Sequence, residues 1–323
     1  MKKSLFGFML VCMIIVSCKK EHSKDSQPGQ TSRKVVFNVG FSQQIVDFNM
    51  GNQKVNNLKS NAVVATLASK IDILYYAVYD SVGHKIHVIK QLSTDSSFGS
   101  YTDILNPGKY SVVVAGGKTG FLLGPDLEGG NATSRLSTDV INYGSYTKAG
   151  TSVWNPFNRD AFFKNIAITV GKTDISQSFA LDRIVSQMVV NIKDAIPSSV
   201  KTIGVSLISH LSDRFLIGTG TAVPSSTSSI NVIDTLASSD IGKTNYQIST
   251  IFLYSAPFGV QIVASSNLDF VAGVIANKAA TATGQPNTQT ILSGYLFGGG
   301  GSGGMSVKID TAWNSAPIVK TFP

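Results

Sequence analysis

Three Gly-Lys-Thr triplets are the first residues of this sequence whose types suggest chemistry, because this triplet resembles the end of a phosphate-binding loop. They lie at residues 117–119, 171–173 and 242–244. A phosphate loop also needs a glycine five positions before the glycine of the triplet, so that main-chain N–H groups can surround the phosphates. Those positions hold Val112, Ile166 and Ala237. We therefore predict that the three triplets are turns.

Histidines and acidic residues give no stronger candidate for a metal or catalytic centre. His84 and His87 are three residues apart, and on a strand residues at that spacing point to opposite faces. Neither a Gly-x-Ser-x-Gly sequence nor a catalytic cysteine accompanies His210. Glycoside hydrolysis usually takes two paired carboxylates, yet Glu128 is the sole glutamate after Glu21. We expect no enzyme activity, no metal and no cofactor.

The N-terminus carries the clearest chemical signal, a lipoprotein signal peptide over residues 1–17. Two lysines precede an apolar run at residues 5–16, and Ser17-Cys18 follows at the spacing that a lipoprotein signal peptidase recognises. The run is too short to span a bilayer as a helix. Cleavage after Ser17 would leave Cys18 as the first mature residue, acylated on its sulfur and its amine. Several acyl chains anchor a protein firmly, since one chain alone binds only marginally.

Residues 18–33 read as a flexible tether between the lipid and the folded part. They are polar, contain Pro28-Gly29 and show no apolar period. The only other cysteine, Cys12, lies in the removed segment, so the mature chain has no disulfide. Lys19-Lys20-Glu21 lacks the aspartate that would suggest retention in the inner membrane. We expect a lipid-anchored protein of the outer membrane that is exposed at the cell surface.

The net charge of +8 does not indicate nucleic-acid binding. It arises from few acids, 19 Asp and Glu, rather than from clustered bases, and no basic run exceeds Lys19-Lys20. Nucleic-acid binding normally needs basic residues concentrated on one face, often with aromatic residues between them.

Beyond the tether the apolar residues recur with period two, as in Val35, Phe37 and Val39. Residues 71–79 form a nearly continuous apolar run, which predicts a central strand covered on both faces. Asp80-Ser81-Val82-Gly83 then predicts a hairpin turn into a strand at 85–90. Further strands are expected at residues 109–115, 175–181, 185–192, 200–209, 246–254, 259–264, 288–297 and 305–309, with at most one short helix among 52–70.

The composition also favours strands and turns over helices. Glutamate, which favours helix interiors, occurs twice, whereas aspartate, which favours turns and caps, occurs seventeen times. Many short strands separated by turn signals are typical of antiparallel β-sandwiches. We therefore expect an all-β chain with an N-terminal β-sandwich at 34–172 and a C-terminal β-sandwich at 173–323.

Four segments in this order resemble the fimbrillin-associated anchor and minor-subunit lipoproteins of Bacteroides-type fimbriae. The first is the lipidation sequence with its tether. The others are the apolar strand and turn at 73–83, the Leu-Asn-Pro-Gly-Lys-Tyr segment with its β-run at 105–117, and Leu181-Asp182-Arg183 with the strand and Ile196-Pro197 that follow. The end of the chain, residues 290–313, is similar to the terminal hairpin of that family.

The resemblance implies two transthyretin-like β-sandwiches in tandem and a non-enzymatic role as a fimbrial anchor or accessory subunit. It also implies fimbrial subunits as partners, joined by β-strand addition, and a membrane bound through the acyl chains on Cys18. Arg33 occupies the place of a proteolytic maturation site before the first strand. The glycine-rich residues 298–304 and the non-basic residues 281–289 depart from the family pattern, which leaves anchor, tip and stalk subunits open.

Two other functions stay open on the sequence alone. A glycan-binding surface lipoprotein would use the same tether and sandwiches, and it predicts an exposed aromatic platform at Trp154, Tyr143 or Tyr146. A secreted hydrolase would require a clustered pair of aspartates in a cleft.

Overall fold

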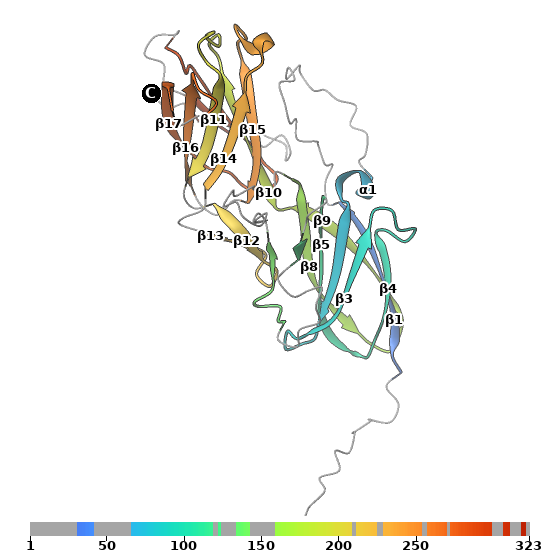
Figure 1. Cartoon of the computed structure of the whole chain (residues 1–323). Helices are drawn as coiled ribbons and strands as arrows, with labels where there is room; N and C mark the ends of the chain where they lie inside the picture. Colours follow the sequence, from blue (N-terminus) through green and yellow to red (C-terminus); the bar gives the residue numbers. More distant parts are fainter. Residues whose placement is uncertain are drawn as a thin grey trace, which may run out of the picture.

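The computed structural model describes most of the chain after the tether. The described residues are 31–41, 66–118, 122–123, 134–142, 159–208, 211–224, 229–253, 257–269, 272–298, 306–310 and 318–320. Among them, nearly all regular structure is β-strand, with the four-residue helix α1 (Leu67–Lys70) and the 3-10 turn η1 (Ser238–Asp240). Two β-sandwiches follow each other along an elongated molecule (Figure 1).

The first sandwich is one seven-stranded sheet folded into two layers. Its strand order is β3 (Lys85–Leu92), β2 (Ile73–Tyr79), β5 (Gly108–Gly117), β8 (Ala161–Val170), β9 (Ile175–Arg183), β1 (Arg33–Phe41) and β4 (Ser100–Leu105). The layers join where β8 meets β9, and these two strands pair only at Phe162 with Arg183 and Phe163 with Asp182. The two strands are not paired beyond these positions, so the layer β3-β2-β5-β8 lies opposite the layer β9-β1-β4.

The core of the first sandwich is built by alternate residues of the facing layers. Val35 and Phe37 of β1 are fully buried, and they pack with Tyr76, Val112 and other residues of the opposite layer. The Phe37 ring stands edge-on to Phe179 of β9, with 5.8 Å between ring centroids. The period of two seen in the sequence thus fixes which side of β1 is buried.

In the second sandwich, a nine-stranded sheet packs against a four-stranded sheet. The larger sheet has the order β20 (Ile318–Lys320), β19 (Ser306–Asp310), β18 (Gln289–Gly294), β10 (Val185–Ile192), β15 (Tyr246–Leu253), β12 (Ser212–Leu216), β7 (Val140–Asn142) and β6 (Leu122–Leu123), and β13 (Thr221–Pro224) pairs with β12. The smaller has β14 (Ser229–Thr235), β11 (Thr202–Ile208), β16 (Phe258–Ser265) and β17 (Val274–Ala282). Met188, Phe252 and Phe258 lie in the core between them.

A third apolar cluster joins the two sandwiches. Tyr75 and Val113, on the outer face of the first sandwich, pack in one cluster with Val185, Phe215 and Leu253. Strand β2 is therefore buried on both faces, and six of its seven residues are buried. This confirms the prediction of a central strand covered on both sides.

The chain order repeats one pairing pattern in both sandwiches. Strand β1 of the first sandwich and strand β10 of the second each pair antiparallel with one neighbour and parallel with another. The parallel neighbours are β9 and β18. All other strand pairs among the described residues are antiparallel.

The expected all-β class with two tandem β-sandwiches is confirmed. Every strand predicted from the sequence is present within a few residues, the hairpin turn contains Gly83 with a positive φ of 84°, and the helix α1 lies within residues 52–70. The division at residue 172/173 stays a prediction. Strand β9 follows that point yet pairs with β1 and β8, while β6 and β7 precede it yet belong to the sheet of the second sandwich.

Candidate attachment and docking surfaces

The predicted attachment residues lie at the N-terminal end of the described structure. Ser17 and Cys18 are outside the described residues, whereas Arg33 is the first residue of β1. None of the helices that the structure describes is long and apolar enough to cross a membrane. The attachment of this chain to lipid therefore stays a prediction from its sequence.

The chain is fixed at the point where it enters the first sandwich. The Lys34 N–H donates to Asp174 Oδ1 at 3.0 Å, in the turn between β8 and β9. The Ser32 hydroxyl donates to Asn106 Oδ1 at 2.8 Å, in the turn between β4 and β5. Because Arg33 lies between these two bonds and pairs with Leu105 of β4, it is held in a strand rather than in a free loop.

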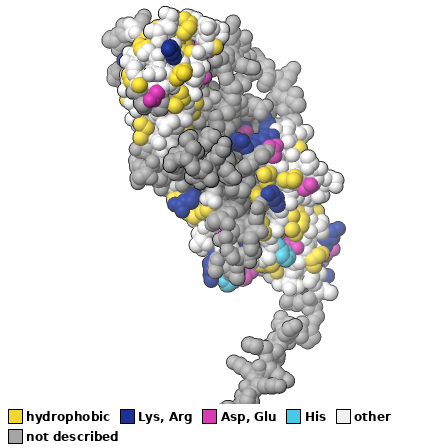
Figure 2. Space-filling model, in the orientation of Figure 1, with side chains coloured by type: hydrophobic (Ala, Val, Ile, Leu, Met, Phe, Trp, Pro, Cys, Tyr) yellow, Lys and Arg dark blue, Asp and Glu magenta, His cyan; other side chains and the backbone are white. Residues whose placement is uncertain are grey.

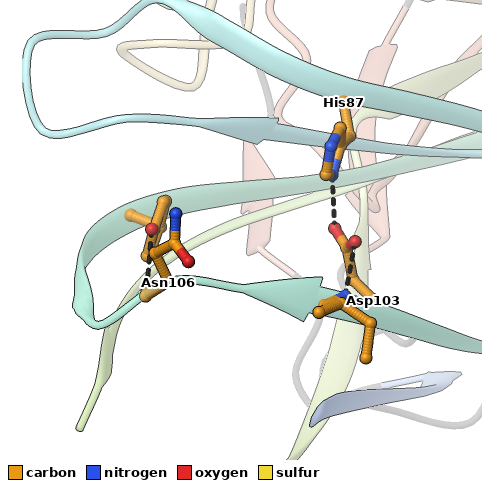
Figure 3. A network of polar contacts seen from close by, with 5 residues as sticks. His87, Asp103 and Asn106 are labelled. Atoms are coloured by element: carbon orange, nitrogen blue, oxygen red, sulfur yellow. Dashed lines mark hydrogen bonds and ion pairs between the residues drawn. The ribbon is translucent and has the colours of Figure 1, made fainter. Parts of the chain in front are cut away.

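The two edge strands of the first sandwich, β3 and β4, are joined by a polar contact that closes this side of the sandwich. His87 of β3 bonds Asp103 Oδ2 of β4, with 2.8 Å between Nδ1 and the oxygen (Figure 3). Asp103 is 5% exposed and also accepts the Ile104 N–H at 2.7 Å. Burial, the charge of Asp103 and a hydrogen bond to it together raise the pKa of Tyr101 to about 12. A buried charge at an edge strand disfavours pairing with another chain.

A second residue of β3 strengthens the same closure. Gln91 is 5% exposed, and its side-chain amide donates to the carbonyl oxygen of Ser100 at 2.8 Å. Its Oε1 accepts the Gly99 N–H at 3.1 Å. Side chains of β3 thus satisfy main-chain groups at the start of β4, which leaves this side of the sandwich firmly joined.

Each of the two edge strands of the four-stranded sheet, β14 and β17, has a charged residue on its core-facing side. On β14, Asp234 accepts the Tyr246 hydroxyl of β15 at 2.5 Å. On β17, Lys278 pairs with the fully buried Ile262, so it shares the core-facing side and reaches the solvent at the edge. The pairing of β17 also shifts register between Ala264 and Ser265. Inward-facing charges and bulges are the devices by which natural proteins prevent edge-to-edge pairing.

The side of the first sandwich where β8 and β9 separate is built differently. Past the ion pair between Lys164 and Asp182, whose Nζ and Oδ2 are 2.8 Å apart, β1 is the sole strand that pairs with β9 in the part of the chain that the structure describes. Its core-facing residues beyond this point include the buried Phe179 and Leu181 and the half-buried Gln177, and none is charged. Among the described strands, residues 175–180 of β9 therefore have β1 as their sole paired neighbour, and the core-facing side chain of Phe179 is buried there.

A buried ion pair lies where the two sandwiches meet. Arg183 Nε is 2.7 Å from Asp160 Oδ1, and the two side chains are 0% and 10% exposed. The guanidinium also lies over the Phe162 ring, 5.6 Å from its centroid. One residue, Ile184, then links β9 to β10. An open groove of about 440 Å³ beside this link is lined by Phe163, Asn165, Phe215 and neighbouring residues.

The remaining sequence candidates serve local structure. His84 and His87 bond different partners, since His84 Nδ1 is 3.4 Å from Asp80 and His87 bonds Asp103. Within the described residues there is no group of three or more His, Cys, Asp or Glu side chains that could hold a metal. Tyr143, Tyr146, Trp154 and Trp313 lie outside the described residues.

Charged side chains do not form one large patch on the visible face. Among the described residues in Figure 2, Lys and Arg side chains are spread along the molecule, with acidic side chains between them. The arrangement of the strand edges is the feature that sequence reasoning did not identify. Alternation of apolar residues marks a strand but does not tell which of its edges stays unpaired.

No protein-family model and no curated protein matches the chain. Solved structures do. A candidate cell adhesion protein from Bacteroides eggerthii matches with a TM-score of 0.53 and 10% identity over 87% of this chain and 95% of that one. Candidate polysaccharide-binding proteins from Bacteroides thetaiotaomicron match with a TM-score of 0.51 and 8% identity over 81% and 92%.

The fimbrial anchor protein Mfa2 from Porphyromonas gingivalis also matches, with a TM-score of 0.48 and 8% identity over 90% of this chain and 100% of that one. At such low identity, the two matches with TM-scores above 0.5 show a common fold and no more, and they agree with the fold that the sequence resemblance implied.

Proposed function

We propose that this protein is a non-enzymatic fimbrial anchor or accessory subunit at the cell surface, tethered to the outer membrane through lipid on Cys18. The observation that carries the proposal is the tandem β-sandwich fold, which is similar over 87% of the chain to a candidate cell adhesion protein. The lipoprotein signal before the tether supplies the anchoring chemistry.

The partner in this proposal is another fimbrial subunit that adds a strand to the first sandwich. The open side between β8 and β9 supports this, because among the described strands β1 alone pairs with residues 175–180 of β9. The outer face of β9 carries the small, exposed residues Ser176, Ser178 and Ala180, so an added strand would meet no bulky side chain there. Main-chain hydrogen bonds would give the affinity, and the apolar inner face would give the specificity.

Proteolysis at Arg33 would oppose this function rather than mature it. Cleavage after Arg33, the first residue of β1, would cut off the tether and leave the rest of β1 in its place between β9 and β4. It would therefore release the folded part from the membrane without opening a groove for another strand. An anchor would keep the bond after Arg33 intact, and the two hydrogen bonds that flank Arg33 support such protection.

Glycan binding is the second candidate, favoured by the similarity of the fold to candidate polysaccharide-binding proteins. It would place the protein at the same surface and would use the same lipid tether. Phe163 and Phe215 lie in the wall of the open groove beside Ile184. The two side chains are 8% and 4% exposed, so a sugar ring could stack on them only after a rearrangement of the groove.

The anchor proposal is tested in the native cell with Cys18→Ala and, as a matched control, Cys12→Ala in the removed segment. Surface fibres are isolated and examined by mass spectrometry and electron microscopy. We expect the chain to co-purify with fibres, and Cys18→Ala but not Cys12→Ala to shed or lengthen them. A wild-type chain that stays in the membrane fraction without fibres, and that binds a glycan array, would favour the second candidate.

Strand addition is tested by placing an inward charge on β9, as nature does on β17. Gln177→Lys puts a lysine on the core-facing side of the open edge, and Asn277→Lys is the control at the exposed side of β17. We expect Gln177→Lys alone to reduce the recovery of fibre subunits with this chain. Equal recovery with both variants, in folded protein, would exclude the β8–β9 side as the docking edge.

A further inference from the structure

We propose that the parallel pair of β1 and β9 is a mechanical clamp that carries load between the tether and the second sandwich. This inference takes the direction of the load from the proposed anchoring function. The evidence for the clamp itself lies in the geometry of the two strands, in what holds β1, and in how β9 continues.

The two points at which load enters the clamp, the start of β1 and the end of β9, lie at opposite ends of this strand pair. Because β1 and β9 are parallel, the tether enters β1 at the end where β9 begins, and β9 runs away from that end. At its far end β9 passes through Ile184 directly into β10 of the second sandwich. Figure 1 shows β1 entering the first sandwich at the end remote from the second.

A pull between the tether and the second sandwich therefore acts along the strands in opposite directions. In this shear geometry the inter-strand hydrogen bonds, which are evenly spaced in a parallel pair, are strained together rather than one after another. The ladder runs from Val35 opposite Ile175 to Phe41 opposite Leu181. Sliding β1 by even one residue would break the whole register at once.

Strand β1 is held on its other side and in the core as well. It pairs with β4 from Arg33 to Asn38, and Phe37 is fully buried with rings of three other strands around it. The Phe41 ring contacts Phe162, with 4.9 Å between centroids. Withdrawing β1 must thus expose core aromatics in addition to breaking two ladders, which adds to the barrier.

The far end of the clamp is equally firm. Arg183, the last residue of β9, is buried with Asp160, which directly precedes β8. The third apolar cluster then joins β2 and β5 of the first sandwich to β10 and β15 of the second. Because one residue separates β9 from β10, force reaches the ladder without first extending a linker.

Single-molecule force spectroscopy on the full mature chain tests the clamp. In the Cys18→Ala background no cysteine remains, so paired cysteines at exposed positions serve as handles. Handles at Thr31 and Ala180 load β1 against β9 in shear. Handles at Thr31 and Lys172 load the adjacent ends of the two strands and peel them apart. We expect a severalfold higher rupture force in the shear geometry than in the peeling geometry.

A matched pair of core variants adds a second readout. Phe37→Ala weakens β1, whereas Phe258→Ala removes an equally buried ring from the second sandwich. At constant load between Thr31 and Ala180, we expect Phe37→Ala to shorten the lifetime about tenfold or more, because forced unfolding follows the unfolding rate. Phe258→Ala should leave that lifetime unchanged.

Two results would overturn the clamp, namely equal rupture forces in the two geometries or equal effects of the two phenylalanine variants. Neither would affect the anchoring proposal, which depends on the fibre experiment with Cys18→Ala. Conversely, if the fibre experiment contradicted the anchoring proposal, the source of load in the cell would be gone, but the measured rupture forces would still stand.

Discussion

The two sandwiches share one pairing pattern but complete it differently. In the first, β1 pairs with β9, and among the described strands β9 pairs on its other side with β8 alone, at Asp182 and Arg183. In the second, β10 pairs with β18, and β19 and β20 extend the sheet beyond it. Among the described residues, no strand takes the corresponding place in the first sandwich. This difference is the reason why we propose that a partner's strand adds to the first sandwich rather than to the second.

The largest loss of stability should come from a substitution in the core of β1, the strand that lies between β9 and β4 in the first sandwich. Phe37→Ala removes a fully buried ring from β1, and such substitutions cost about 3–5 kcal/mol. Denaturant unfolding with hydrogen exchange should show lower stability and early loss of protection in β1 and β9. Asn38→Ala, on the exposed side of β1, is the control and should change little. Protection lost first in β10 and β18 would contradict the assignment of this core to β1.

Removing a polar contact that joins two strands should lower the stability by less, and by different amounts in the two sandwiches. Asp103→Ala leaves His87 and the Ile104 N–H without a buried acceptor and should cost about 1–3 kcal/mol. Tyr246→Phe removes only a hydroxyl that donates to Asp234, so it should cost about 0.5–1.5 kcal/mol. Chemical denaturation of both variants measures the difference. If Tyr246→Phe lowered the free energy of unfolding more than Asp103→Ala, the polar contact in the second sandwich would contribute more to stability than the one in the first.

Alkaline pH should weaken the first sandwich through its buried tyrosines. Burial raises the pKa of Tyr79, helped by the charge of Asp139 and a hydrogen bond to it, and burial raises the pKa of Tyr76. The pKa of Tyr101 rises from 10.0 to about 12. A raised folded-state pKa stabilises the fold below the unfolded-state value, and this contribution is lost as pH rises through the folded value.

Stability should therefore fall between about pH 10 and about pH 12. Absorbance of tyrosinate, followed together with circular dichroism, measures ionisation and unfolding in the same titration. Tyr79→Phe should make the fall shallower, because one buried hydroxyl no longer has to ionise. Ionisation of all tyrosines well before any unfolding would show that these side chains are accessible in the folded state.

The smallest effect on folding should come from the edge of β17. Lys278→Ser removes an exposed charge, so the free energy of unfolding should change by no more than about 0.5 kcal/mol. The same change removes the inward charge that protects this edge, and we expect concentration-dependent self-association by light scattering or analytical ultracentrifugation. The exposed-side variant Asn277→Ser is the control and should stay as monodisperse as the wild type.

Much of this architecture could be predicted from the pattern of apolar residues. Strands such as β1, β2 and β10 were predicted because their buried sides alternate or run continuously. Strand β8 was missed because Ala161, Phe162 and Phe163 are buried in succession, facing two different clusters. Strand β17 was missed because its alanines have low β propensity and its residues are mostly exposed.

The edge of β9 at which we propose docking could not be predicted from the sequence, for a different reason. Whether β9 has a free side depends on where β8 lies, and that in turn depends on two pairs near Phe162 and Arg183. These contacts are set by tertiary structure and leave no periodic signal in either strand. The proposed attachment residue is the opposite case, because the sequence around Cys18 alone predicts lipidation.

The pairing of β1 with β9 also constrains the order in which the chain can fold. Val35 and its partner Ile175 are 140 residues apart, so the N-terminal strand waits for more than half of the chain before its parallel neighbour exists. Contacts of such long range form slowly, since the intervening chain must close a large loop first. A polypeptide that crosses a membrane N-terminus first would therefore keep its first sandwich unfolded during most of its passage, which is the state that export through a narrow channel requires.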